Sequence, residues 1–471
     1  MASNARESLA RALKAHALIF NRATLVDGIF PGPLIAAQKH WHGIFQNGTN
    51  YADGTSFVTQ CPIAQNHSFL HSFSAPNQAG TYWYHSHYSV QQESIAQTLQ
   101  TQGPLVIYDP HDPLAYMYDV DDASTVITLA DWYHVVAPVL RHIIGISTNI
   151  SLINGQGRYA GGPMSDLAVI NVEQGKRYRM RLVAMSCDPN FQFSVDGHNL
   201  TIIEADGVLT EPLVADKPVD NYWIRSLPSS NLSSEGGINS AILRYKGATT
   251  ADPTTVNTPS TNSLQEANLH ALINPGAPGI PEYGKADINL NLAVTNVGGT
   301  FYVNNVTYQP PTVPVLLQIL SGAQEPSQLL RNDSIIVLEA NKVVELTLST
   351  TGLGGPHPIH LHGSAGNTSA FNYVNPVRRD VVSAGSLGQQ MVIRWTTDNS
   401  GPWFLHCGFA VVMAESPSDT RAHISPVPAD WDQLCPIFDS LSPSQLGGGG
   451  FKSYEEAANI TTLLFPTSSI H

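Results

Sequence analysis

Three pairs of histidines stand two residues apart in this 471-residue chain, each beside apolar or aromatic residues. The pairs are His40 with His42, His85 with His87, and His360 with His362. Because residues i and i+2 of an extended strand point to the same face, each pair aims two imidazoles in one direction. One such pair is weak evidence, since isolated histidines are commonly surface or core residues. Three pairs in matching contexts predict a metal cluster.

An internal repeat supports this interpretation. HWHG at 40–43 is followed, 43 residues after its second histidine, by His85 in GTYWYHSH. HLHG at 360–363 is followed after 44 residues by His406 in GPWFLHC. In both copies a glycine precedes the later histidine by five positions. The repeat predicts two copies of one β domain near the two ends of the chain.

His357 and Cys407 are expected on the opposite face of the same strands. His357 is an odd number of residues from His360, and Cys407 directly follows His406, so both would point away from the cluster. A thiolate with imidazoles and no second cysteine favours a blue-copper electron-transfer site over structural zinc. The bonded path from Cys407 to His406 would then carry electrons from the outer site to the cluster. The alternative is that Cys407 is a buried, unreactive thiol.

Composition and patterning indicate the elements that position these side chains. Charged residues are 13% of the chain and hydrophobic residues 42%, with 37 Gly and 32 Pro, which is typical of short strands joined by turns. An all-β protein of two or three domains is therefore expected. A passage rich in Pro, Thr and Asn, at 250–285, is predicted to be a linker. Period-two alternation predicts strands in five segments: 124–133, 191–207, 313–322, 334–350 and 389–399.

Charge and targeting signals narrow the possible partners and location. The net charge of -14 argues against nucleic acid as a partner. No apolar run approaches the ~20 residues that span a bilayer, so no membrane association is expected. Nine Asn-x-Ser/Thr sequons favour a secreted glycoprotein. The first 20 residues carry charges and lack the apolar region of a signal peptide, so an extracellular location is predicted against the evidence of the N-terminus.

Four motifs together, HWHG, WYHSH, HPIHLHG and WFLHC, resemble the copper-binding motifs of multicopper oxidases. SCDPNFQFSVDGHNLTIIEADG, GGINSAILRYKGA and VPVLLQILSGAQ resemble fungal laccases in particular, and the resemblance runs from about residue 21 to near the C-terminus. It implies three cupredoxin-like domains, each a Greek-key β-sandwich or barrel, at 1–123, 124–285 and 286–471, the first two shortened. It also implies a mononuclear copper in the third domain and a trinuclear cluster between the first and third.

The resemblance assigns a role to each candidate ligand. His40 and His360 would hold the lone copper of the cluster. His42 and His85 would serve one member of the coupled pair, and His87, His362 and His406 the other. The mononuclear copper would be held by His357 and Cys407.

Other residues receive roles from the same resemblance. Cys61 and Cys435 could form a disulfide. Asp206 would be the acidic substrate contact that accepts a phenol proton, although it could instead be a turn former. Asn239 is a weaker candidate for the wall of the substrate site. His134 and His198 are expected to be structural, because neither has a partner at metal spacing.

The chain departs from the family pattern immediately after Cys407. The pattern places a histidine directly after the cysteine and another a few residues on, but here the strand GFAVVMAE follows at once. One absent histidine would complete the pair site of His42 and His85, and the other would be the second imidazole of the mononuclear site. His423 is the nearest substitute. The cysteine that normally follows HSH is also absent, so Cys187 would lose its partner.

For an intact member, the resemblance implies that phenols or aromatic amines, including lignin-related compounds, give single electrons to the mononuclear copper. Dioxygen is then reduced to water at the cluster. Family members hold four coppers, and this chain could hold fewer; a monomer is expected. Three hypotheses remain: a laccase-type oxidase; a ferroxidase-type metal oxidase, against which seven scattered Met argue only weakly; and an impaired or inactive relative produced by a splicing or gene-model error.

Overall fold

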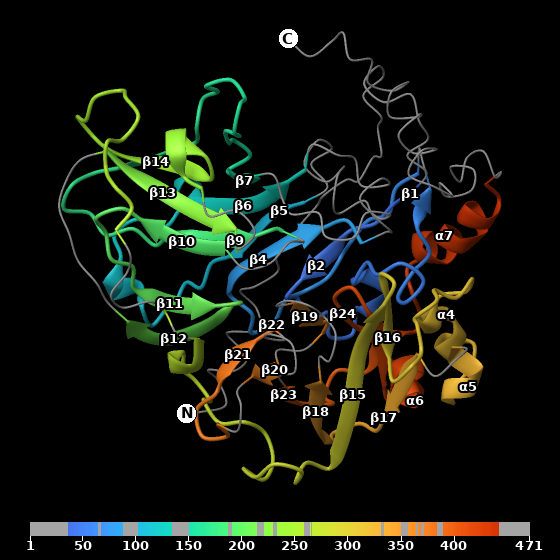
Figure 1. Ribbon diagram of the computed structural model, residues 1–471. Helices are drawn as coiled ribbons and strands as arrows, with labels where there is room; N and C mark the ends of the chain where they lie inside the picture. The colour runs from blue at the N-terminus through green and yellow to red at the C-terminus, as the bar shows by residue number, and fades with distance from the viewer. Residues whose placement is uncertain are drawn as a thin grey trace.

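The computed structural model describes most of the chain in segments: residues 36–64, 67–87, 102–133, 150–186, 191–213, 221–228, 233–258, 264, 266–330, 334–349, 357–363, 366–368, 372–383 and 390–441. Within these segments strands predominate, which confirms the all-β prediction (Figure 1). None of the helices in the described segments is long and apolar enough to cross a membrane.

Two sheets of the C-terminal region pack face to face. Their shared core contains Leu346 and Ile393 from one sheet and Leu405 and Met413 from the other. The first sheet has the order β17 (Ile335–Leu338), β25 (Ala410–Glu415), β24 (Gly401–His406), β19 (Pro358–Leu361), β22 (Val381–Ser383). The second has the order β16 (Thr300–Val303), β15 (Ile288–Val297), β18 (Val343–Ser349), β23 (Gln390–Thr396), β20 (Gly366–Thr368), β21 (Val377–Arg379).

The middle of the chain forms a second sandwich. Ile127 of one sheet and Ile224 of the other are buried in its core. One sheet has the order β10 (Phe191–Val195), β13 (Asn221–Pro228), β14 (Ser240–Tyr245), β8 (Val169–Val172). The other has the order β7 (Ile150–Ile153), β6 (Val126–Trp132), β9 (Arg181–Ala184), and a separate hairpin joins β11 (Ile202–Ala205) to β12 (Val208–Leu213).

The N-terminal part has smaller sheets in its described residues. One has the order β2 (His40–His42), β4 (Gly80–His85), β5 (Gly103–Ile107), and β1 (Ala36–Ala37) pairs with β3 (Ile63–Ala64). Trp41 points away from its two histidine neighbours into a core with Ile44 and Tyr82, as the alternation of a strand requires.

The N-terminal and C-terminal parts are joined directly. Asn399 donates from Nδ2 to the Phe45 carbonyl at 2.6 Å, and Asn50 donates to the Pro402 carbonyl at 3.2 Å. The Cys61–Cys435 disulfide also links these two parts, which confirms the predicted pairing. These contacts place β2 and β4 beside β19 and β24 (Figure 1).

The described chain also contains short α-helices and 3-10 turns. Helices α4, α6 and α7 pack with Cys61 and Phe69 in one apolar cluster. The α-helices are α4 (Val315–Leu320), α5 (Pro326–Leu329), α6 (Pro417–Ile424) and α7 (Ala429–Asp439). The 3-10 turns are η1 (Asn50–Ala52), η2 (Ala115–Met117), η3 (Ala123–Thr125), η4 (Glu235–Gly237) and η5 (Glu266–Asn268).

Four of the five predicted strand segments contain strands, and the prediction for 313–322 is wrong. That segment forms helix α4, with Pro314 at its N-cap. The buried side chains are Val315, Leu316 and Ile319, which is the spacing of a helix face rather than of a strand. The described residues of 250–285 contain η5 as their one named element.

Candidate metal centre

Two antiparallel strand pairs bring the histidines together. On the N-terminal side β2 pairs with β4, so that His40 lies directly opposite His85. On the C-terminal side β19 pairs with β24, and His360 lies opposite His406. The sequence repeat therefore corresponds to a repeated pairing, and each copy places one histidine across from another.

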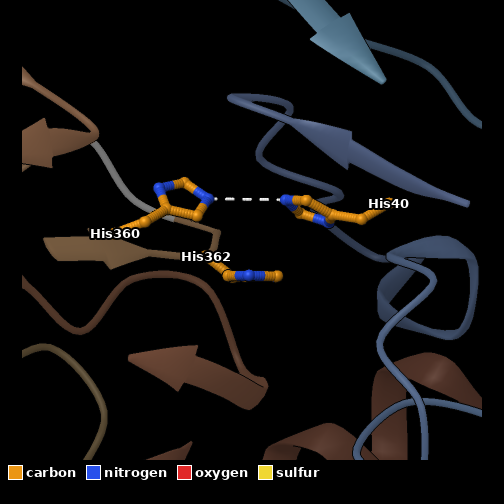
Figure 2. Close-up of side chains that lie close together, drawn as sticks. All are labelled: His40, His360 and His362. Atoms are coloured by element: carbon orange, nitrogen blue, oxygen red, sulfur yellow. Dashed lines mark hydrogen bonds between the residues drawn. The ribbon is translucent and has the colours of Figure 1, made fainter. Parts of the chain in front are cut away.

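The two strand pairs face each other, and their imidazole ε nitrogens converge. The Nε2 atoms of His40 and His360 are 3.4 Å apart. Figure 2 shows this contact, with His362 beside it; its ring stacks on that of His40 at a centroid distance of 3.8 Å. The Nε2 atom of His406 lies 3.1 Å from that of His362 and 3.3 Å from that of His87. Side chains more than 300 residues apart in sequence therefore form one cluster.

Acceptors behind the rings fix the tautomer of several imidazoles. His40 Nδ1 donates to the Asp53 carbonyl and His360 Nδ1 to the Asp380 carbonyl, both at 2.9 Å. His362 Nδ1 donates to Asp53 Oδ2 at 3.0 Å, and His85 Nδ1 donates to the Ser86 carbonyl at 2.9 Å. Since a neutral imidazole carries one proton, the Nε2 atoms of these rings present lone pairs.

The facing Nε2 atoms of His40 and His360 consequently have no hydrogen between them. Two lone pairs at 3.4 Å repel one another unless a cation lies near both. Two donor atoms that each lie about 2.0 Å from one tetrahedral ion are about 3.3 Å apart. The spacing of the ε nitrogens fits a bound metal.

Burial keeps these imidazoles neutral. Desolvation, followed by the neighbouring imidazoles, lowers the pKa of His85, His360, His362 and His406 well below the usual value. Desolvation also lowers the pKa of His87 to about 3. Neutral imidazole is the form that binds metal, so protons compete weakly at these positions.

The ligand atoms form overlapping sets in which all members lie within 4.8 Å of one another. The sets are His40, His360 and His362; His40, His42 and His85; His87, His362 and His406; and His42, His360 and Asp380.

Cys407 and His357 form a smaller constellation nearby. The Cys407 sulfur lies 3.4 Å from His357 Nδ1. Cys407 begins the short turn that joins β24 to β25, and its N–H donates to the Phe409 carbonyl at 3.0 Å. Burial raises the pKa of the Cys407 thiol to about 11, so metal binding there must release a proton.

Comparison with known proteins identifies the family. Models of the multicopper oxidase family match residues 37–112, 123–217 and 308–416, more than half of the chain. The chain belongs to the multicopper oxidase family.

Among its curated relatives is a laccase from Pycnoporus cinnabarinus, 50% identical to this multicopper oxidase over 90% of this chain and 92% of that protein. A crystal structure of laccase from Botrytis aclada superposes with a TM-score of 0.74, at 27% identity, and covers 88% of this chain and 84% of that one. The structure of Fet3p, a multicopper oxidase that functions in iron import, gives a TM-score of 0.71 at 25% identity, over 89% and 86%.

These similarities confirm the predicted fungal laccase identity and the cupredoxin-like fold. This multicopper oxidase is an oxidoreductase of the laccase type. Family membership implies copper as the cofactor, and the donor set fits copper because imidazole and thiolate are ligands that it favours.

Asp206 lines a cavity of about 290 Å³ together with Gly43, Tyr82 and Asp380. Its Oδ2 accepts from Arg379 Nε at 3.0 Å. Desolvation raises the pKa of Asp206, opposed by Arg379. The cavity is also lined by Asp380, which lies 3.5 Å from His42 of the cluster, and Cys407 is not among its lining residues.

Asn239 is fully buried. Its Oδ1 accepts from the Ser151 N–H at 2.7 Å, and its Nδ2 donates to the Ser233 carbonyl at 2.9 Å. Both ends of the amide are therefore engaged in the interior, which argues against the predicted place in a substrate wall.

The remaining predicted histidines are structural where they are described. His198 bonds the Asp196 carbonyl and the Tyr245 hydroxyl, each at 2.9 Å. His423 is exposed on α6 and donates to the Asp419 carbonyl, so the described structure does not bring it to either copper site. His134 and Cys187 lie outside the described residues.

Sequence reasoning missed two carboxylates, Asp53 and Asp380. The Asp53 carbonyl accepts a hydrogen bond from His40 Nδ1, and its carboxylate accepts one from His362 Nδ1. The Asp380 carbonyl accepts a hydrogen bond from His360 Nδ1, and its Oδ1 atom lies 3.5 Å from His42 Nε2. Neither belongs to a histidine motif, and only the fold reveals their position.

Proposed function

We propose that this laccase-type oxidase reduces dioxygen at a copper cluster held by seven histidines. These are His40, His42, His85, His87, His360, His362 and His406. The observation that carries the proposal is the convergence of these imidazoles, four of which (His40, His85, His360 and His362) have Nδ1 bonded to a fixed acceptor. Copper, when bound, supplies the one-electron redox chemistry. The protein holds four of these rings in one tautomer and limits water access, since five of the seven are buried and His87 and His406 are half-buried.

We further propose that His357 and Cys407 form the electron entry point. Their 3.4 Å separation and the direct bond between residues 406 and 407 support this role. An S,N pair is a weaker copper site than the family's set, because a missing ligand lowers affinity. We therefore expect fewer than four tightly bound coppers per chain and slower turnover than in relatives with the full set.

Phenols and aromatic amines, including lignin-related compounds, are the proposed electron donors, as the laccase relatives support. Asp206 would accept the phenol proton if the substrate enters the cavity beside it. This role of Asp206 as proton acceptor rests on the resemblance of the chain to fungal laccases. Ferrous iron is a second candidate donor, supported by the likeness to Fet3p and by acidic side chains in the same cavity: Asp109, Asp112, Asp206 and Asp380.

The biological setting completes the proposal. We propose a monomeric, extracellular, glycosylated protein with domains at 1–123, 124–285 and 286–471. The sequons, the disulfide and the three family-model matches support it. Mass photometry of the secreted product and endoglycosidase digestion test the monomer and the glycans.

Copper content and absorption test the copper sites. Purified, copper-loaded protein should contain fewer than four coppers per chain and show at most a weak thiolate-to-copper band. Dioxygen uptake should occur with a phenol and, if the second candidate holds, with ferrous iron. Four coppers with an intense blue band would show that other residues replace the absent histidines. A chain without bound copper or dioxygen uptake would contradict the cluster.

A further inference from the structure

The Asp380 carboxylate lies against the histidine cluster. Asp380 stands between β21 and β22, and its Oδ1 is 3.5 Å from His42 Nε2. Only 9% of its side chain is exposed, and 10% of that of His42. With His42 and His360 it forms one of the sets of groups that can share a metal ion.

The main chain holds this residue in place. The Asp380 carbonyl accepts from His360 Nδ1 at 2.9 Å and from the Leu361 N–H at 3.3 Å. The neighbouring Arg379 pairs with Asp206 and with Glu266, at 3.0 and 2.7 Å. The backbone of Asp380 therefore orients one imidazole of the set while its side chain reaches another.

Gly43 leaves the room that the carboxylate occupies. Its φ is +86°, and a Cβ at this position would lie 2.8 Å from Asp380 Oδ2 and 2.6 Å from Tyr82 Cδ1. The residue that follows His42 must be small for Asp380 to sit here.

The 3.5 Å spacing favours shared coordination over a hydrogen bond. A normal N–H···O bond spans about 2.7 to 3.2 Å. Donor atoms on one tetrahedral ion are about 3.3 Å apart. The separation also resembles those between the cluster's ε nitrogens, at 3.1 to 3.4 Å.

We propose that Asp380 is a copper ligand in this chain, in one set with His42 and His360. The inference rests on the proposed copper cluster. A carboxylate is a harder, anionic donor than imidazole, so this copper should favour the oxidised state more than an all-imidazole site would.

Copper analysis of Asp380→Asn in the full-length chain tests the proposal. The asparagine keeps the shape but is a weaker donor, so dialysed protein should lose about one copper per chain, or bind copper ~10 to 100-fold more weakly in competition titrations. Nitrogen hyperfine structure in the Cu(II) EPR spectrum should change as well. Asp380→Glu should recover part of the affinity.

Two controls separate coordination from other effects. Asp109→Asn removes a charge from the same cavity without removing a partner of Arg379, and it should keep the wild-type copper content. Unfolding of the metal-free Asp380→Asn protein should match that of metal-free wild type, whereas its stabilisation by copper should shrink. Gly43→Ala, which displaces the carboxylate, should reproduce the copper loss.

The outcomes are distinct. Asp380→Asn protein with the copper content and EPR spectrum of wild type would overturn the assignment and leave the histidine cluster intact. An equal loss of stability with and without copper would make Asp380 a structural residue and overturn it too. Wild-type protein that binds no copper would overturn both the cluster and this inference.

Discussion

The histidine cluster and the Cys407–His357 pair lie at neighbouring positions of the chain: His360 and His406 stand on β19 and β24, whereas His357 directly precedes β19 and Cys407 directly follows β24. In the cluster, rings are fixed from behind by Asp53, Ser86 or Asp380 and from the side by strand pairing. In the outer pair the Cys407 sulfur lies in the turn after β24, 3.4 Å from His357 Nδ1, and the His357 ring contacts that of Phe301 at a centroid distance of 6.0 Å.

The difference between the two sites lies in how their ligands are attached to the strands. His406 and Ala410 are paired in register, so β24 and β25 stay joined although the family's intervening histidines are absent. Strand pairing preserves the inner ligands that lie on strands. The two proposed outer ligands, His357 and Cys407, lie just outside these strands.

The largest expected effect comes from removing a ring shared within the cluster. His362 belongs to two of the ligand sets. His362→Ala should remove at least one copper and lower dioxygen uptake about 100-fold or more, because a direct ligand is lost. Elemental analysis and oxygen-electrode rates measure this, and unchanged values would show that the cluster is not the reaction site.

Removing the Cys407 thiol tests the role of the Cys407–His357 pair. Cys407→Ser should abolish any thiolate-to-copper absorption and slow phenol oxidation about 10-fold or more. The copper content of the cluster should stay the same, since Cys407 belongs to none of its sets. Loss of cluster copper in this variant would mean that the two sites are not independent.

A carboxylate behind the cluster gives an intermediate effect. Asp53 Oδ2 accepts from His362 Nδ1. Asp53→Ala should weaken copper binding ~10 to 100-fold. Asp53→Asn, which keeps an oxygen acceptor, should weaken it less. If both variants bind copper as well as the wild type, the hydrogen bond from His362 to Asp53 does not contribute to copper affinity.

The smallest effect is a pH dependence of the metal-free protein. The pKa of His87 falls from 6.5 to about 3 on burial, so the unfolded chain binds more protons than the folded chain between these values. The stability contribution is present above pH 6.5 and is lost as pH falls toward 3. Chemical denaturation at several pH values should show this decline; a flat profile would argue against burial of a neutral ring.

The histidine motifs could be predicted because strand periodicity acts locally. His40 with His42, and the matching repeat, need only alternation to share a face. The positions of the Asp53 and Asp380 carboxylates could not be predicted, because they contact rings from distant segments of the chain. The segment Val315–Leu320 is predicted as a strand but forms a helix, because a short apolar run fits both periods; Pro314 at the N-cap marks the start of the helix.

The register that sets His40 against His85 and His360 against His406 also bears on how electrons move. Opposed residues in antiparallel strands have Cα atoms about 4.5 to 5.5 Å apart, a spacing set by the sheet rather than by side-chain rotamers. Such a frame gives the rings little freedom to follow a change in metal charge. A low reorganisation energy is therefore expected for a metal bound between rings that stand on paired strands.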